Sequence, residues 1–154
     1  MTSRKRIQAW TDGSCETQTG DGGWAYLLRH NGHELSEAGH ETGTTNNRME
    51  LTAAVKALAS LNEACDVTLT TDSQYLRKAF TEGWLTRWLR NGWQTAGREP
   101  VKNQDLWQEL LVLTERHHVE WRWTRGHSGH SENETVDKLA LDARKRQQPF
   151  KSRS

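Results

Sequence analysis

The sequence has few cysteines and no long apolar stretch, and each shortage disfavours a class of protein. Cys15 and Cys65 are far apart and neither belongs to a closely spaced pair, so a disulfide framework and a cysteine zinc site are both disfavoured. No apolar run approaches the length of a membrane span, and the basic start of the chain leads into residues 8–12 instead of a hydrophobic signal segment. We therefore expect a protein of a reducing compartment, the cytoplasm.

The chain also lacks an excess of charge of either sign. Its 21 basic and 20 acidic residues leave a formal charge of +1, which argues neither for nor against a polyanionic partner. Only 33% of the residues are hydrophobic, yet eight tryptophans supply large surfaces for a core or for stacking. A length of 154 residues suits one domain. We expect a single domain over residues 1–146 and a flexible basic tail over residues 147–154.

Strand patterns dominate the first part of the chain. Residues 6–14 are predicted to form a strand that ends at Asp12-Gly13-Ser14, because glycine and serine favour turns. Two further strands are predicted over residues 24–28 and in a stretch through Leu35, with a turn near Asn31-Gly32. We expect these three strands to form an antiparallel meander.

Helical spacing begins at Thr44. The apolar positions at i, i+3, i+4 and i+7 are Leu51, Ala54, Val55 and Leu58, and Asn46 or Asn47 can cap the start of this helix. Residues 67–72 follow as a short strand rich in β-branched residues, and Ser73 can cap a second helix through Phe80.

The second half of the chain alternates between helices and one strand. A helix followed by a protruding loop is predicted over residues 84–102, and Asn103 can cap the next helix. Alternation of Val119, Trp121 and Trp123 predicts a strand. Capping-box spacing from Ser131 to Glu134 starts a last helix, whose apolar face holds Val136, Leu139, Ala140 and Ala143. This order predicts an α/β (α+β mixed) fold, a mixed sheet with helices on its faces.

Four acidic residues stand at notable places in these elements. Asp12 and Asp72 end predicted strands, Glu50 lies in the first turns of a helix, and Asp137 lies near the first turns of the last helix. Carboxylates brought together without a cation would repel one another, and Mg²⁺ prefers such oxygen ligands. Each acid also has a local alternative, as a turn residue, a cap or a solvated helix acid. Spacing alone leaves these alternatives open.

Four segments together resemble the successive signature segments of bacterial type I ribonuclease H. They are Thr11-Asp12-Gly13-Ser14-Cys15, Thr45-Asn46-Asn47-Arg48-Met49-Glu50-Leu51, Thr71-Asp72-Ser73-Gln74-Tyr75, and Gly126-His127-Ser128-Gly129-His130 continuing through Asn133-Glu134 to Asp137. The matches run in the family's order from about residue 7 to residue 143, so the resemblance covers nearly the whole predicted domain.

The resemblance implies a ribonuclease H-like fold, a five-stranded mixed sheet with three antiparallel strands first and helices on both faces. It also implies an endonuclease that hydrolyses the RNA strand of RNA–DNA hybrids, leaving 5′-phosphate and 3′-hydroxyl ends. Asp12, Glu50, Asp72 and Asp137 would hold two Mg²⁺ ions, with Mn²⁺ as a possible substitute, for an in-line displacement. A monomer without an obligate protein partner or a membrane is expected.

His127 would assist proton transfer or product release in such a site, because an imidazole titrates near neutral pH. The alternative is a surface histidine beside a turn. The remaining histidines of this half are expected at the surface or in helix caps, namely His117, His118 and His130.

Similar proteins line the minor groove of the hybrid with short polar groups and rest a basic handle on the DNA strand. Residues 84–102 resemble this handle and are called the handle below. The residues expected to bind substrate are Ser14, Cys15, Thr45, Asn46, Asn47, Ser73, Gln74, Trp84, Trp88 and Asn103. Helix capping explains the asparagines Asn46 and Asn47 equally well, and core packing explains the tryptophan pair equally well.

The chain departs from the family pattern at two positions. Gly43 stands where many relatives have an arginine, and Gln18 stands where an asparagine is typical. The handle also has few lysines, so we expect weaker hybrid binding with a shallower salt dependence than in a strongly basic relative. Two rival functions are an inactive nucleic-acid-binding module of the same fold and a related metal-dependent DNA nuclease. The complete acid set disfavours the first rival, and the groove residues with the handle disfavour the second.

Overall fold

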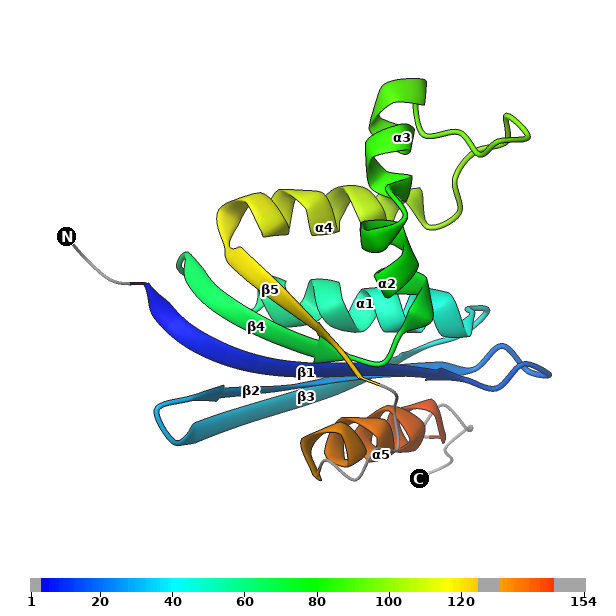
Figure 1. The fold of residues 1–154 in the computed structure, drawn as a ribbon. Helices are drawn as coiled ribbons and strands as arrows, with labels where there is room; N and C mark the ends of the chain where they lie inside the picture. The colour runs from blue at the N-terminus through cyan, green and yellow to red at the C-terminus, as the bar shows by residue number, and fades with distance from the viewer. Residues whose placement is uncertain (1–3, 125–130, 146–154) are drawn as a thin grey trace.

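The computed structural model describes residues 4–124 and 131–145, which build one five-stranded sheet with helices on both faces (Figure 1). The strands are β1 (Lys5–Cys15), β2 (Gly22–His30), β3 (His33–Glu41), β4 (Cys65–Thr71) and β5 (His118–Trp123). Their order across the sheet is β3-β2-β1-β4-β5. The first three strands pair antiparallel, whereas β4 pairs parallel with both β1 and β5. This mixed sheet confirms the predicted fold class.

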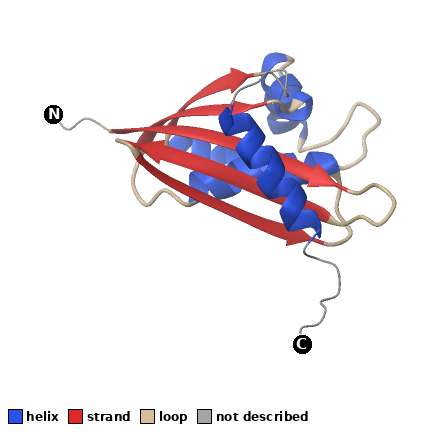
Figure 2. Ribbon diagram, turned by 90° about the horizontal axis from the view of Figure 1, so that it is seen from below, coloured by secondary structure: helices blue, strands red, loops and turns tan. Residues whose placement is uncertain are grey.

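Helices cover the two faces of the sheet unequally. They are α1 (Asn46–Ala59), α2 (Gln74–Thr81), α3 (Trp84–Asn91), α4 (Gln104–Arg116) and α5 (Ser131–Lys145). Helix α5 lies alone across β1, β2 and β3 on one face, and Figure 2 shows it crossing these strands. On the other face α1 packs on β1 and β2 and is covered in turn by α4 (Figure 1). Within the described ranges, no helix has the length and apolarity needed to cross a membrane.

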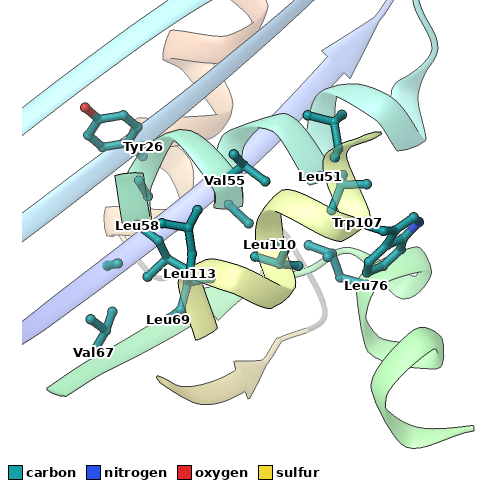
Figure 3. Close-up of a cluster of buried hydrophobic side chains, with 14 of the residues drawn as sticks. Tyr26, Leu51, Val55, Leu58, Val67, Leu69, Leu76, Trp107, Leu110 and Leu113 are labelled. Carbon is teal, nitrogen blue, oxygen red and sulfur yellow. The ribbon is translucent and has the colours of Figure 1, made fainter. Parts of the chain in front are cut away.

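Alternating side chains of the strands divide the core in two. On β2, Tyr26 and Leu28 face the larger cluster under α1 and α4, whereas Ala25 and Leu27 face α5. Figure 3 shows the larger cluster, in which side chains of α1 and α4 meet those of the strands and of α2. Its labelled members are Tyr26, Leu51, Val55, Leu58, Val67, Leu69, Leu76, Trp107, Leu110 and Leu113. Burying each such aliphatic side chain stabilises the fold by about 1.5–3 kcal/mol.

Two glycines let helices approach the sheet more closely than a side chain would allow. A Cβ atom at Gly13 in β1 would overlap the backbone of Met49 and Glu50 in α1. A Cβ atom at Gly23 in β2 would overlap the carbonyl oxygen of Ala140 in α5 and lie 2.6 Å from the backbone nitrogen of Arg144. The two helices therefore contact the strand backbones directly at neighbouring places in the sheet, because Ser14 of β1 pairs with Gly23.

Three sequence expectations need correction. The N-cap of α1 is Thr45, whose side chain accepts a hydrogen bond from the backbone of Arg48, so the cap is neither Asn46 nor Asn47. Strand β3 continues past Leu35 to Glu41, although its exposed, polar outer positions give no alternating pattern. Strand β1 does not end at Asp12, since Gly13, Ser14 and Cys15 continue its pairing with β2. His117 caps the end of α4, one of the two places expected for it, and is buried.

A hydrogen bond explains why His117 can be buried. Its Nδ1 atom accepts a hydrogen bond from the backbone nitrogen of Cys65 at 3.1 Å, which joins the end of α4 to the start of β4. Burial lowers the pKa of this imidazole, so the neutral form is the one that fits this junction. The predicted tail over residues 147–154 lies outside the described residues.

The close contact at Gly23 predicts a large cost for a single methyl group. We expect Gly23→Ala to lower the free energy of unfolding by about 1–3 kcal/mol, because backbone atoms of α5 would have to move. Urea denaturation measures this difference. Gly97→Ala is the matched control, since the nearest atom to its added methyl group is Thr95 Oγ1 at 3.9 Å. An equal loss in both variants would show that overlap with α5 is not the cause.

Candidate active site

Two parallel strands bring Asp12 and Asp72 to the same edge of the sheet. The register of β1 and β4 pairs Trp10 with Thr70, and each aspartate stands two residues beyond this pair. Because parallel strands end at the same edge, both carboxyl groups emerge side by side. Asp12 is buried with 8% exposure, whereas Asp72 is half-buried just after the end of β4.

Helix α1 adds the third carboxyl group. Gly13 allows the first turns of α1 to lie directly on β1, which places Glu50 next to Asp12. One carboxylate oxygen from each of Asp12, Glu50 and Asp72 lies within 4.8 Å of the other two. Three acids that are widely separated in the sequence therefore face one small volume.

Asp137 reaches the same place from the other face of the sheet. It lies in α5, is exposed, and forms a side-chain hydrogen bond with Asp12. A small pocket between β1 and α5 is lined by Thr11, Asp12, Asp72, Asn133, Glu134, Val136 and Asp137. The structure thus brings all four predicted acids together, although Asp137 is outside the tightest group of three.

Asn133 and Glu134 also line this pocket, a role that was not predicted, since Glu134 was expected only to complete a helix cap. They precede Asp137 by four and three residues, so the three side chains share one face of α5. That spacing was the available signal. Asn133 also donates a hydrogen bond to Thr124 Oγ1 at 3.4 Å, which ties the start of α5 to the segment after β5.

The electrostatic consequence is most severe for Asp12. The pKa of Asp12 is raised to about 9, above all by burial of its carboxyl group. The charge of Asp72 raises it further, followed by the hydrogen bond and charge of Asp137 and the charge of Glu50. Each charged group that dominates this pKa is another carboxyl group. An ionised cluster is therefore unfavourable unless a cation joins it.

The pKa of Glu50 is also raised, but hydrogen bonds oppose the shift. Burial raises its pKa to about 7, and the charge of Asp72 acts in the same direction. Hydrogen bonds from the side chains of Ser73 and Asn46 oppose this shift. Ser73 is buried and also caps α2, where its Oγ accepts a hydrogen bond from the backbone of Leu76. Two of the predicted substrate-binding residues thus contact a member of the acid cluster.

The donor set fits a hard divalent cation. All its donors are carboxylate oxygens, which Mg²⁺ and Mn²⁺ prefer, and the cluster contains no sulfur or imidazole ligand among the described residues. A bound cation would also remove the repulsion that raises the pKa of Asp12 and Glu50. The residues present therefore fit a divalent metal.

Polar groups expected to bind substrate surround the cluster. Ser14 and Cys15 end β1, where Ser14 Oγ accepts a hydrogen bond from Arg144 and the Cys15 thiol donates to the carbonyl oxygen of Thr44. The Arg144 contact was not predicted, because it joins residues far apart along the chain. Around the helix starts, the exposed predicted residues are Thr45, Asn46, Asn47 and Gln74.

The tryptophan pair of the handle packs on the core and also lines an open hollow. Trp84 and Trp88 are half-buried and pack against the large core, with the Trp88 ring 5.6 Å from the buried Trp107 ring. Their other sides line a hollow of about 410 Å³ together with Arg87, Asn91, Gln94, Thr95 and Ala96. Core packing therefore leaves an aromatic surface open.

Asn103 precedes α4 as predicted, but its side chain does not cap the helix. Its amide instead accepts a hydrogen bond from Arg48 and donates one to the Tyr75 hydroxyl. His127, the predicted proton-transfer residue, lies outside the described residues.

The acid cluster predicts an unusual pH dependence of stability in the absence of metal. The pKa of Asp12 is raised above its usual value of 3.8, so its contribution to stability is complete below that pH and is lost as the pH rises towards about 9. In chelator at pH 8 we expect Asp12→Asn to raise the free energy of unfolding by roughly 1–3 kcal/mol, since one pKa unit corresponds to about 1.4 kcal/mol.

Denaturation with chelator and with Mg²⁺ at pH 5 and pH 8 measures this effect. Mg²⁺ should stabilise the wild type more than the variant, because a bound ligand stabilises the folded state that binds it. Asp142→Asn, in a surface pair with Lys138, is the control that should change stability little. A wild type as stable as Asp12→Asn in chelator at pH 8 would contradict the repulsion argument.

Comparisons with known proteins identify the family. The family model for RNase H matches residues 4–145. A ribonuclease H of Alkalilimnicola ehrlichii is 58% identical over 134 residues, which cover 87% of this chain and 91% of the relative. A ribonuclease H of Halorhodospira halophila is 57% identical over 141 residues, which cover 91% of this chain and 94% of the relative.

Solved structures agree. The crystal structure of LC9-RNase H1, described as a type 1 RNase H with the type 2 active-site motif, matches with a TM-score of 0.80 and 31% identity, covering 94% of this chain and 74% of that one. The family match spans all of the described residues, including the strands and helices that carry the acid cluster. The chain therefore belongs to the ribonuclease H family.

Proposed function

We propose that this chain is an endonuclease that hydrolyses the RNA strand of RNA–DNA hybrids and leaves 5′-phosphate and 3′-hydroxyl ends. Membership of the ribonuclease H family makes it a nuclease. The observation that carries the proposal is the convergence of carboxylates from β1, α1 and the end of β4 within 4.8 Å. Asp137 supports it from α5 through its hydrogen bond with Asp12.

Asp12, Glu50, Asp72 and Asp137 would hold two divalent ions, with Mg²⁺ as the physiological metal and Mn²⁺ as a substitute. When bound, such ions supply Lewis-acid activation of a water molecule and stabilise charge in an in-line displacement at phosphorus. Asp12 lies between the other acids, as its interactions with all three show. It is the carboxylate whose ionisation depends most on a cation.

The chain's own residues orient the carboxylates. Ser73 and Asn46 donate hydrogen bonds to Glu50, which favour its ionised form and fix its orientation. The backbone nitrogen of Ser73 in turn donates to Thr71 Oγ1 at 3.2 Å, so the turn after β4 is held where Asp72 emerges. We assign His127 to proton transfer or product release.

Substrate is proposed to lie across the starts of α1 and α2 and the end of β1. The exposed Asn46, Asn47 and Gln74 can reach sugar hydroxyls in a minor groove, and the 2′-hydroxyl is the group that separates RNA from DNA. The open faces of Trp84 and Trp88 suit the deoxyribose of the other strand. Thr45 and Asn103, which flank Arg48, complete the contacts beside the handle.

The two rival functions fit less well. An inactive binding module gains nothing from a buried carboxyl cluster whose repulsion destabilises it. A DNA nuclease does not require groups that recognise ribose. We also propose a monomer that acts in the cytoplasm without an obligate protein partner.

One assay tests the activity. Labelled RNA–DNA hybrid, RNA duplex and DNA duplex are incubated with Mg²⁺ or chelator, using the wild type and Asp72→Asn. We expect cleavage of the RNA strand of the hybrid alone, lost in chelator and lowered by more than about a hundredfold in the variant, since even groups behind metal ligands contribute 10–100-fold. Asp66→Asn, in the same strand but away from the cluster, should retain activity. Full activity of Asp72→Asn would remove the metal-site assignment.

A second test concerns the missing cation at position 43. Gly43→Arg should steepen the slope of log affinity against log salt by about one, because one more phosphate contact releases about one more counterion. Gly43 has a φ of 61° and open space around it, so the variant should lose about 1 kcal/mol of stability yet fold.

Gly32→Arg is the matched control for this test. Gly32 also has a positive φ and open space, but it lies in the turn between β2 and β3 at the other end of β2 from Gly22 and Gly23. The added charge and the backbone strain are therefore the same, and only the place differs. An equal change of slope in both variants would show a general charge effect instead of a phosphate contact at position 43.

A further inference from the structure

Arg48 is the most connected side chain near the acid cluster that the proposed mechanism leaves without a role. It lies in the first turn of α1, two residues before Glu50. Its guanidinium donates hydrogen bonds to both carboxylate oxygens of Asp105 at the start of α4, with Nη1 3.1 Å from Oδ1 and Nη2 2.8 Å from Oδ2. Nη1 also donates to Asn103 Oδ1 at 3.2 Å. One side chain thus joins the helix that carries Glu50 to the segment that follows the handle.

The handle is placed both by packing of Trp84, Trp88 and Val101 on the large core and by the polar contacts at its base. The hydrogen bonds of its loop are internal, such as Thr95 N to Glu99 O at 2.7 Å and Val101 N to Trp93 O at 3.0 Å. These bonds shape the loop but do not fix it relative to the carboxylates. Figure 1 shows α3 and this loop projecting away from the sheet.

Asn103 is the residue where the handle meets α4, and it has an unusual backbone. Its φ is 61°, in the left-handed region, and its side chain makes no cap hydrogen bond. Its amide is fixed at both ends instead, by Arg48 at Oδ1 and by the Tyr75 hydroxyl 3.2 Å from Nδ2. The Tyr75 hydroxyl also accepts a hydrogen bond from Trp107 Nε1 at 2.9 Å, which anchors this network to the core.

The Arg48–Asp105 pair is too exposed to matter much for folding. The side chain of Arg48 is 30% exposed and that of Asp105 is 65% exposed. Ion pairs this close to solvent contribute little to stability, because water and salt screen them. Its bidentate geometry, in contrast, fixes the direction as well as the distance between two helix starts. The pair therefore suits alignment better than stabilisation.

We propose that Arg48 is a positioning residue, which holds Asn103, Asp105 and hence the handle in register with the carboxylates and thereby determines how tightly the hybrid binds. This inference rests on the proposed function, because the handle and Asn103 are assigned there to the substrate. Arg48 acts through its partners and not by touching the substrate itself.

A direct phosphate contact by Arg48 predicts the opposite behaviour of its partner. Removing Asp105 would then free the guanidinium and remove a negative charge, and both changes should favour a polyanion. If Arg48 positions the handle, Asp105→Ala weakens binding despite the more favourable charge. Whether Asp105→Ala weakens or strengthens hybrid binding therefore distinguishes a positioning role of Arg48 from a direct phosphate contact.

The experiment measures kcat and KM for hybrid hydrolysis in Mg²⁺, and thermal unfolding, for Arg48→Gln, Arg48→Lys, Asp105→Ala and the double variant Arg48→Gln with Asp105→Ala. We expect each single variant to raise KM by about two- to fivefold, as for loss of one half-exposed pair, with kcat within about twofold of the wild type. The double variant should be no worse than Arg48→Gln alone, because both changes break one interaction. Arg48→Lys should not restore KM, since an ammonium group cannot form the bidentate pair.

Arg29→Gln is the matched control. Arg48 lies near a second carboxylate, with its Nε 3.8 Å from Glu41 Oε1, and Arg29 likewise pairs with two, Glu34 and Glu132. The Arg29 variant therefore loses the same charge and a similar set of contacts elsewhere. Its KM should change less than that of Arg48→Gln. An unchanged or lower KM in Asp105→Ala, or full recovery in Arg48→Lys, would overturn the positioning role. Failure of the wild type to cleave hybrid would instead overturn the proposed function.

Discussion

The direct contact of helix backbone with strand backbone at Gly13 and Gly23 is the constraint on which the site depends. At Gly13 the first turns of α1 lie against β1, and at Gly23 the last turns of α5 lie against β2. Because β1 and β2 are neighbours, the two contacts hold helices from opposite faces of the sheet at one edge. Glu50 and Asp137 can reach Asp12 only because these helices are held so closely.

The same arrangement opposes the stability of the fold. Four carboxyl groups meet where burial already disfavours charge. The raised pKa values of Asp12 and Glu50 show that ionising these groups together is unfavourable. Hydrogen bonds from Ser73 and Asn46 offset part of it at Glu50. The large core under α1 and α4 supplies stability that offsets the cost of bringing these carboxyl groups together. Such a conflict between local preference and global fold is typical of functional sites.

Several parts of this arrangement were accessible from the sequence because they depend on local periodicity and on recognisable segments. The helix around Leu51, the meander of the first three strands and the position of Asp72 just after a strand all follow from such patterns. The capping residue Thr45 and the outer half of β3 did not, because neighbouring polar residues compete for a cap and an exposed edge strand has no apolar alternation. The capping position of His117 was among those predicted, but its burial was not, since polar residues are buried only where a distant partner, here Cys65, satisfies them.

The sequence by itself determined which chemical groups are present and which strands and helices carry them, because hydrogen bonding and side-chain periodicity act over a few residues. Only the tertiary structure decided that the oxygens of Asp12, Glu50 and Asp72 lie within 4.8 Å, since this distance depends on parallel pairing and on two glycine contacts between distant segments. The tertiary structure likewise decided that Arg48 forms an ion pair with Asp105, a pairing that no local rule predicts. The order of residues along the chain determines which side chains each strand or helix carries. The packing of helices on the sheet determines the distances between those side chains.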